Sequence, residues 1–127
     1  RKLDFPVGQY AIFGSGPMWV RGIRESDDLD IIARGGAWEQ AKAGGIVGVK
    51  EYSGLQYVHF ADEKIEAYND WYPGKWDIDK LIDTAEIIDG IPFVRLESVV
   101  EWKKIMGREK DGKDLVLIQE YLLKNPT

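Results

Sequence analysis

The tetrapeptide Gly-Ser-Gly-Pro at residues 14–17 places the strongest local constraint on the fold. A short β-prone run at residues 9–13 ends there abruptly, and the chain must turn tightly. Beyond the turn, apolar residues recur with near-helical spacing, at Met18, Trp19, Val20 and Ile23. The sequence therefore predicts a strand, a tight turn and a short helix that is capped by Ser15 or Gly16 and reaches about Arg24.

The rest of the chain alternates between β-prone and helix-prone segments. Further strands are expected at residues 28–33, 46–52, 55–60 and 64–68, the last three as antiparallel neighbours. Further helices are expected at residues 37–43, 77–85 (capped by Asp77), 96–106 and 111–123, with Gly107 between the last two. This order predicts one α+β domain over residues 1–127, with helices flanking a mixed, mostly antiparallel sheet.

The composition excludes several classes of function. There is no cysteine and one histidine, His59. Thiol catalysis and Cys-ligated zinc are therefore excluded, as is any Ser-His-Asp triad or multi-His metal site that does not use His59. Catalysis would have to rest on carboxylates, Lys, Arg or hydroxyl groups.

Charge and hydropathy restrict the partners. The 17 Lys and Arg against 22 Asp and Glu give a net charge of −5, which argues against long nucleic acid as a partner. No apolar run reaches the roughly 18 residues that cross a bilayer, and no signal-peptide pattern opens the chain. We expect a cytoplasmic protein with no membrane partner.

Two carboxylates and a glycine turn form the candidate chemical site. Asp28 and Asp30 flank one residue on an expected strand, so both project from the same face, roughly 7 Å apart. Hard cations such as Mg²⁺ prefer such oxygen ligands together with substrate phosphates. The glycine turn at residues 14–16 opens a helix, and its backbone N–H groups favour an anion. The sequence thus predicts a divalent metal next to a phosphate.

Each feature also has a simpler structural explanation. Acidic pairs at strand ends are common on solvated edges, and a glycine turn is often only a turn with a helix cap. An inward-pointing lysine can extend along apolar surface to reach solvent. These alternatives stay open at the level of the residues.

The spacing of these residues resembles a known superfamily. Phe13-Gly14-Ser15 followed by Asp28-Leu29-Asp30 is similar to the signature of the DNA polymerase β-like nucleotidyltransferases, in which Gly-Ser at a strand end precedes Asp-x-Asp on the next strand. The C-terminal third also looks like the ending of small bacterial and archaeal proteins of that fold, at Leu96-Glu97, Lys103 and Gly107-Arg108-Glu109-Lys110-Asp111. The resemblance covers most of the chain and implies a nucleotidyltransferase fold.

The resemblance also implies a site and an activity. Asp28 and Asp30 would bind Mg²⁺ or Mn²⁺ together with a third carboxylate, and Glu66 best matches that position, although Asp is commoner there. Nucleotide phosphates would be held by Gly14, Ser15, Arg24 and Lys103. The implied reaction is transfer of a nucleoside monophosphate, AMP by default, from a nucleoside triphosphate such as ATP to an acceptor hydroxyl. The acceptor itself is not named by the sequence.

The residues around Lys103 support a site independently. On the expected helix 96–106 the apolar stripe of Leu96, Val99 and Val100 continues to Lys103, so this lysine points inward. A buried cation needs an anion, which a triphosphate or the carboxylate cluster would supply. Residues 95–113 carry six basic and four acidic residues, which is typical of a cationic wall in a nucleotide site.

The small size of the chain favours a second hypothesis. Without a large second domain, the acceptor pocket must be shallow or completed by another chain, either in a homodimer or by a partner protein. The alternative function is therefore a non-catalytic or weakly catalytic interaction module, such as a toxin–antitoxin component.

Overall fold

The computed structural model describes residues 5–26, 28–60 and 64–125. In these ranges the chain is α+β, as predicted, and its strands join into a single sheet. The strands are β1 (Tyr10–Phe13), β2 (Leu29–Ala33), β3 (Ile46–Val49), β4 (Gln56–His59), β5 (Ile65–Tyr68), β6 (Glu86–Ile88) and β7 (Ile91–Phe93). The helices are α1 (Gly16–Val20), α2 (Gly35–Gly44), α3 (Ile78–Asp83), α4 (Leu96–Met106) and α5 (Glu109–Lys124).

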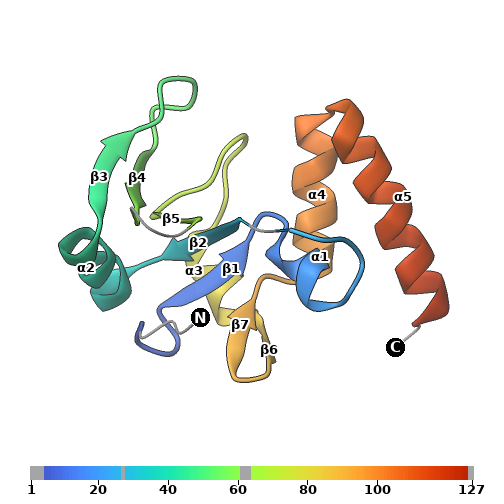
Figure 1. Cartoon of the computed structure of the whole chain (residues 1–127), viewed down its shortest axis with the longest axis horizontal. Coiled ribbons are helices and arrows are strands. Elements are labelled where there is room, and N and C mark those ends of the chain that lie inside the picture. Colours follow the sequence, from blue (N-terminus) through green and yellow to red (C-terminus); the bar gives the residue numbers. More distant parts are fainter. Residues whose placement is uncertain (1–4, 27, 61–63, 126–127) are drawn as a thin grey trace.

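The sheet is mixed and mostly antiparallel, which confirms that expectation. Its strand order is β3-β4-β5-β2-β1-β7-β6 (Figure 1). The parallel pairs are β2 with β5 and β1 with β7, and the other neighbours are antiparallel. Strands β5, β2 and β1 occupy the middle of the sheet, where neighbours on both sides fix the position of every residue that they carry.

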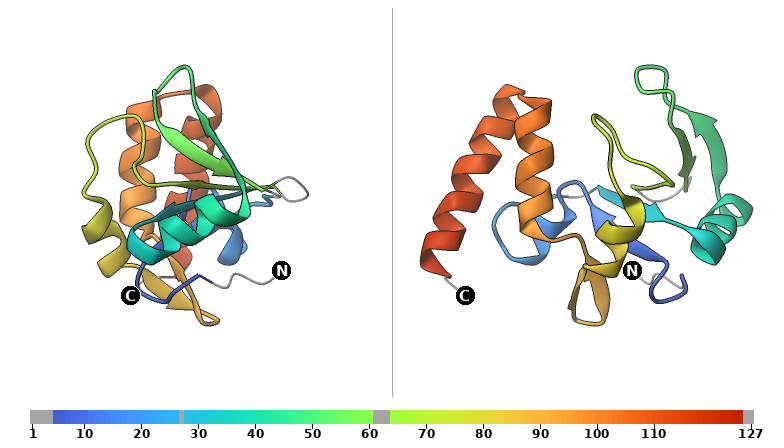
Figure 2. Two further views of the ribbon diagram at one scale, coloured as in Figure 1. Left: turned by 90° about the vertical axis from the view of Figure 1, so that its left-hand side faces the viewer. Right: turned by 180° about the vertical axis from the view of Figure 1, so that it is seen from behind.

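Alternating side chains bury both faces of the central strands. Phe13 on β1 belongs to a core shared with α1, α3, α4 and α5, whereas its neighbour Ile12 belongs to a second core shared with α2. Figure 2 shows α4 and α5 as a helical hairpin at one end of the molecule and α2 at the other. Of the helices in the described ranges, none is both long and apolar enough to cross a membrane.

Helix α1 is shorter than the sequence predicts, because it ends at Val20 and not near Arg24. Gly22 has a φ of 72°, which allows the chain to leave the helix in the left-handed conformation. The Gly22 N–H donates to the Trp19 carbonyl and the Ile23 N–H to the Met18 carbonyl, each at 3.0 Å. This is a Schellman ending, and Gly22 is the sequence signal for it.

The hairpin of β6 and β7 is missing from the sequence-predicted elements. Asp89 and Gly90 join the two strands with φ values of 52° and 79°. Two consecutive positive φ angles are what a type I′ turn requires, and Asp-Gly is a preferred pair there. Isoleucines on either side of this pair are the signal that would have predicted the hairpin.

The C-terminal helices lie close to their expected bounds. Helix α4 spans residues 96–106 as predicted, and α5 begins at Glu109 instead of residue 111. Gly107 ends α4 with a φ of 63°, which glycine adopts without steric strain. Asp77 caps α3 as predicted, because its carboxylate accepts from the Lys80 N–H at 3.1 Å.

Candidate functional site

A cavity of about 390 Å³ opens between the sheet and the α4–α5 hairpin. Its wall comes from the turn after β1, the segment that leads into β2, the β3–β4 turn, the segment after β5 and the α4–α5 junction. The last three all lie along the upper side of the molecule in the view of Figure 1. The sequence-predicted residues in this wall are Ser15, Arg24, Asp28, Asp30 and Lys103.

The glycine turn lies directly over the carboxylate of Asp30. Phe13, the last residue of β1, is paired with Asp30 on the antiparallel strand β2. Gly14 then turns with a φ of 62°, and a Cβ atom built on it would lie 2.7 Å from Oδ2 of Asp30. Only glycine allows this approach, so the local sequence and the sheet register together bring the predicted turn and the predicted carboxylate into contact.

The carboxylates of Asp30, Asp28 and Glu66 interact electrostatically. Asp28 lies exposed just before β2, whereas Asp30 and Glu66 are register partners on β2 and β5. Burial, followed by the charges of Glu66 and Asp28, raises the pKa of Asp30 to about 6, against an opposing effect of Lys50. The sequence therefore gathers negative charge at a site where protonation or a cation would relieve the repulsion.

Glu66 is already held by other side chains. Its carboxylate accepts a hydrogen bond from the Tyr68 hydroxyl at 2.7 Å and forms an ion pair with Lys50 at 3.2 Å. Burial, followed by the hydrogen bond to Glu66, raises the pKa of Tyr68, so this hydroxyl keeps its proton. Within the described part of the chain, no three His, Asp or Glu side chains form a preformed metal site. Asp28 and Asp30 are therefore the pair whose donor chemistry fits a hard cation, and Glu66 lies beside them.

Lys103 points inward as predicted, but two aspartates of α5 accompany it. Its side chain is 2% exposed, and its Nζ lies 2.9 Å from Asp114 and 3.6 Å from Asp111. Arg108 also donates to Asp111, from its backbone N–H at 3.1 Å and from its guanidinium Nε at 2.6 Å, at the start of α5. The anion that Lys103 requires is thus supplied by the protein itself, although Lys103 also lines the cavity.

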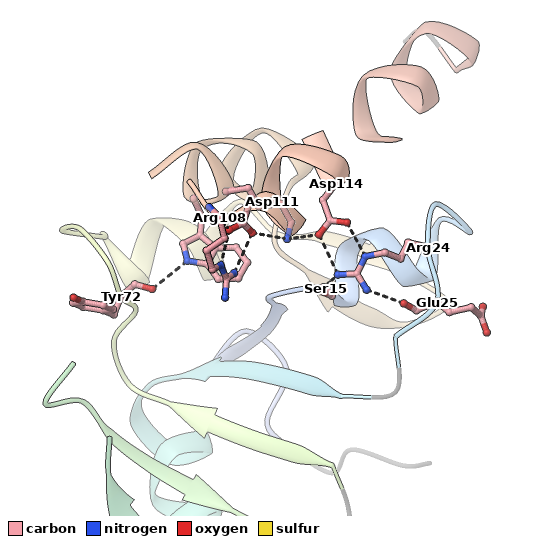
Figure 3. A network of polar contacts seen from close by, with 9 residues as sticks. Ser15, Arg24, Glu25, Tyr72, Arg108, Asp111 and Asp114 are labelled. Atoms are coloured by element: carbon pink, nitrogen blue, oxygen red, sulfur yellow. Dashed lines mark hydrogen bonds and ion pairs between the residues drawn. The ribbon is translucent and has the colours of Figure 1, made fainter. Parts of the chain in front are cut away.

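Asp114 links the C-terminal helices to the glycine turn (Figure 3). Both of its oxygens accept from Arg24, at 2.8 and 3.1 Å. Ser15 is the N-cap residue of α1, as predicted, although its side chain makes no capping hydrogen bond. Its hydroxyl accepts instead from Arg24 at 2.7 Å. Burial would raise the pKa of Asp114, but the hydrogen bonds from Arg24 and Lys103 outweigh it and lower the pKa.

The sequence of α5 contains a signal for this network. Asp111 and Asp114 are three residues apart on α5 and therefore lie on one helix face. The same face carries the buried Ile118, which turns both aspartates toward the interior and toward an inward-pointing lysine on α4. Arg24, by contrast, reaches the network from a distant segment, and no local pattern predicts that contact.

Gly14→Ala is expected to destabilise the protein by about 1–3 kcal/mol, because alanine at positive φ is strained and its Cβ would displace Asp30. Gly112→Ala is the matched control: Gly112 lies in α5 with nothing within 4 Å of a built Cβ. The same change there should stabilise by up to about 1 kcal/mol, since alanine favours helix. Thermal unfolding of both variants measures the difference, and effects of equal sign would contradict the close approach.

Comparison of the chain with protein-family models, with curated proteins and with solved structures finds no match. The interpretation of the site therefore rests on its own geometry.

Proposed function

We propose that this chain is a metal-dependent nucleotidyltransferase that moves a nucleoside monophosphate from a nucleoside triphosphate, ATP by default, to an acceptor hydroxyl. One observation carries the proposal: the Gly14 turn lies on the carboxylate of Asp30, in a cavity that Asp28, Arg24 and Lys103 also line. A phosphate-sized anion and a hard cation have complementary partners there. The nucleotidyltransferase fold is part of the same proposal.

Asp28 and Asp30 are the residues that would hold Mg²⁺ or Mn²⁺. Their oxygen donors fit these ions, and a bound cation would relieve the repulsion that raises the pKa of Asp30 to about 6. When bound, the ion supplies charge neutralisation at the phosphoryl oxygens. Glu66 lies next to Asp30, on the neighbouring strand β5, and adds to the negative electrostatic potential at the site.

The cationic side chains of the cavity would bind the triphosphate. Arg24, Lys103, Arg108 and Lys110 line it. Arg24 and Lys103 share the carboxylate of Asp114, so both are held in place before a ligand arrives. Preorganised donors stabilise the charge that develops on phosphate oxygens better than mobile ones. The Ser15 hydroxyl accepts a hydrogen bond from the Arg24 guanidinium and so helps to hold it in place.

The reaction is an in-line displacement. The oxygen of the acceptor hydroxyl forms a bond to the α-phosphorus while the bond to the bridging oxygen breaks and pyrophosphate leaves. The hydroxyl proton goes to a carboxylate of the cluster, as in general base catalysis. Asp30 and Glu66 are adjacent register partners on β2 and β5, and the resemblance assigns the proton to Glu66.

Asp28→Asn tests the proposal, because Asp28 is exposed and its removal leaves the fold intact. The wild type is tested with ATP, GTP, CTP and UTP, each together with Mg²⁺ or Mn²⁺. A nucleotide present at 100 times its dissociation constant should raise the free energy of unfolding by about 2.7 kcal/mol. Asp28→Asn should weaken metal-dependent nucleotide binding by more than about tenfold. Mutating a residue that only hydrogen-bonds to a metal ligand already costs about tenfold in affinity, and Asp28 is itself the proposed ligand.

The matched control is Glu97→Gln, an exposed carboxylate on α4 outside the cavity. It should leave the thermal shift unchanged. Transfer of α-labelled phosphate to candidate acceptors then follows for the nucleotide that gives the largest shift. No shift with any nucleotide and cation would overturn the proposal, as would equal shifts in Asp28→Asn and the wild type.

A second candidate function rests on strand β3. In the described part of the chain β3 ends the sheet, and its apolar side chains are exposed, Ile46 by 62% and Val49 by 63%. Such an edge is a template for pairing with another strand. We propose as the alternative a non-catalytic assembly module that pairs β3 with β3 of a second copy. Light scattering should then give a dimer that Val47→Lys converts to a monomer, and a monomeric wild type would contradict it.

A further inference from the structure

The cavity has an aromatic wall that the reaction described above does not use. Tyr52 from the β3–β4 turn and Tyr72 from the segment after β5 contribute to it, and Tyr68, Trp71 and Trp102 continue it inward. The rings of Tyr52 and Tyr72 meet edge to face with centroids 5.8 Å apart. They are 72% and 42% exposed, respectively. Two large aromatic rings are therefore left uncovered at the rim.

Hydrogen bonds fix the backbone segments that carry these two exposed rings. The Trp102 indole N–H donates to the Tyr72 carbonyl at 3.1 Å, which fixes the backbone of that segment to α4 (Figure 3). The β3–β4 turn is closed on both sides of Tyr52, because the Gly54 N–H donates to the Lys50 carbonyl at 2.8 Å and the Lys50 N–H to the Leu55 carbonyl at 2.9 Å. A ring-binding surface that is already placed loses little conformational entropy on binding.

Trp71, deeper in the same wall, has an unpaired donor. It is 6% exposed, and its Nε1 is a buried polar atom without a hydrogen-bond partner among the described residues. Phe13 stacks on the ring with centroids 4.6 Å apart, so the indole is held rigidly. Buried donors are normally paired, so this indole N–H is an exception in the wall of the cavity.

Tyr72 and Arg24 occupy different parts of the cavity. In the view of Figure 3, Arg108 lies between Tyr72 and Arg24. Tyr52 contributes, after Asp111, to raising the pKa of Arg108, so these two side chains lie near each other across the rim. A ligand with a planar ring at one end and an anionic group at the other matches this separation.

We propose that Tyr52 and Tyr72 form the nucleobase subsite of this cavity, where the base of a nucleoside triphosphate stacks while its phosphates reach Arg24 and Lys103. This inference rests on the proposed function. Stacking on an aromatic ring tolerates every base, and the larger purines cover more of the two rings. The chain should therefore accept all four nucleotides and bind ATP and GTP more tightly than CTP and UTP.

The experiment distinguishes the contribution of the nucleobase to binding from that of the phosphates. Binding of Mg²⁺-ATP and Mg²⁺-tripolyphosphate to the whole chain is measured by calorimetry for the wild type, Tyr52→Leu, Tyr52→Phe and the control Tyr121→Leu on α5. The wild type should bind ATP more tightly than tripolyphosphate. Tyr52→Leu should weaken ATP binding by about 5- to 150-fold, the range for loss of one stacking ring, with tripolyphosphate unaffected. Tyr52→Phe and Tyr121→Leu should bind both ligands as the wild type does.

The outcomes distinguish this inference from the function on which it rests. Equal affinity of the wild type for ATP and tripolyphosphate would overturn the base subsite and leave the phosphate and metal site in place. Equal weakening of both ligands in Tyr52→Leu would also overturn it, because the tyrosine would then act on the phosphate site. Binding of neither ligand to the wild type would overturn the proposed function and this inference together. Tyr52 is mostly exposed, so its variants are expected to fold.

Discussion

Asp114→Ala is expected to lower the free energy of unfolding by about 3 kcal/mol, because removing one partner of a buried ion pair leaves the charge of the other partner uncompensated. Asp114 lies between Lys103, whose side chain is 2% exposed, and Arg24. Alanine would leave the ammonium group of Lys103 with Asp111 alone, at 3.6 Å. It would also remove the two hydrogen bonds that connect Arg24, and through it Ser15, to α5. Urea unfolding near neutral pH measures the change.

Asp79→Ala is the matched control for this prediction. Asp79 also forms an ion pair with an arginine, Arg34, at 2.8 Å, but its side chain is 75% exposed. Exposed pairs contribute about 0–1 kcal/mol, so this variant should unfold almost as the wild type does. Adding Lys103→Met to an Asp114→Leu variant should restore stability, because the uncompensated charge is then removed. Similar losses for Asp79→Ala and Asp114→Ala would contradict a buried network.

Asp30→Asn is expected to stabilise the metal-free protein near neutral pH by up to about 3 kcal/mol, because one pKa unit corresponds to about 1.4 kcal/mol. The pKa of Asp30 is raised from 3.8 to about 6 in the folded chain, by burial and then by the charges of Glu66 and Asp28. The folded state therefore binds this proton more tightly than the unfolded state does. The contribution of Asp30 to stability is fully present below pH 3.8 and is lost as the pH rises to about 6.

Thermal unfolding in a chelator across this pH range measures the effect. The difference between Asp30→Asn and the wild type should grow from pH 3.8 to about 6 and stay constant above. Added Mg²⁺ should stabilise the wild type and not the variant, since the cation needs the ionised carboxylate. The exposed Glu97→Gln should show neither behaviour. A variant less stable than the wild type at neutral pH would show that the Asp30 carboxylate stabilises the fold, contrary to this prediction.

Much of the fold follows from local patterns. Gly107 and the apolar stripe of α4 predict that helix to the residue, because a left-handed glycine and a helical period are local signals. The α1 helix was predicted too long because its apolar spacing extends to Ile23, whereas Gly22 ends it in a Schellman motif. The β6–β7 hairpin was missed although Asp89-Gly90 carries its turn signal, since each strand has only three residues.

In the candidate site, too, some contacts follow from the local sequence and others depend on the tertiary structure. Gly14 and Asp30 lie on consecutive strands of the chain, and the antiparallel pairing of β1 with β2 brings the glycine turn onto the Asp30 carboxylate. Tyr68 lies two residues from Glu66 on the same strand, and their contact is local. The position of Lys50 against Glu66 depends instead on how β3, β4 and β5 pair, which no local pattern specifies. The prediction of Glu66 as a third ligand stays a prediction for that reason.

The sequence by itself determined the glycine turn, the strand that carries Asp30 and an inward-pointing lysine, because each depends on backbone conformation or periodicity within a few residues, whereas Asp28 lies just before that strand and not on it. Only the tertiary structure decided what that lysine meets. Asp111, Asp114 and Arg24 compensate Lys103 inside the protein, and the aromatic wall forms from turns far apart in the chain. The physical reason is that burial and charge pairing depend on which distant segments pack together, and that choice is made by the whole core.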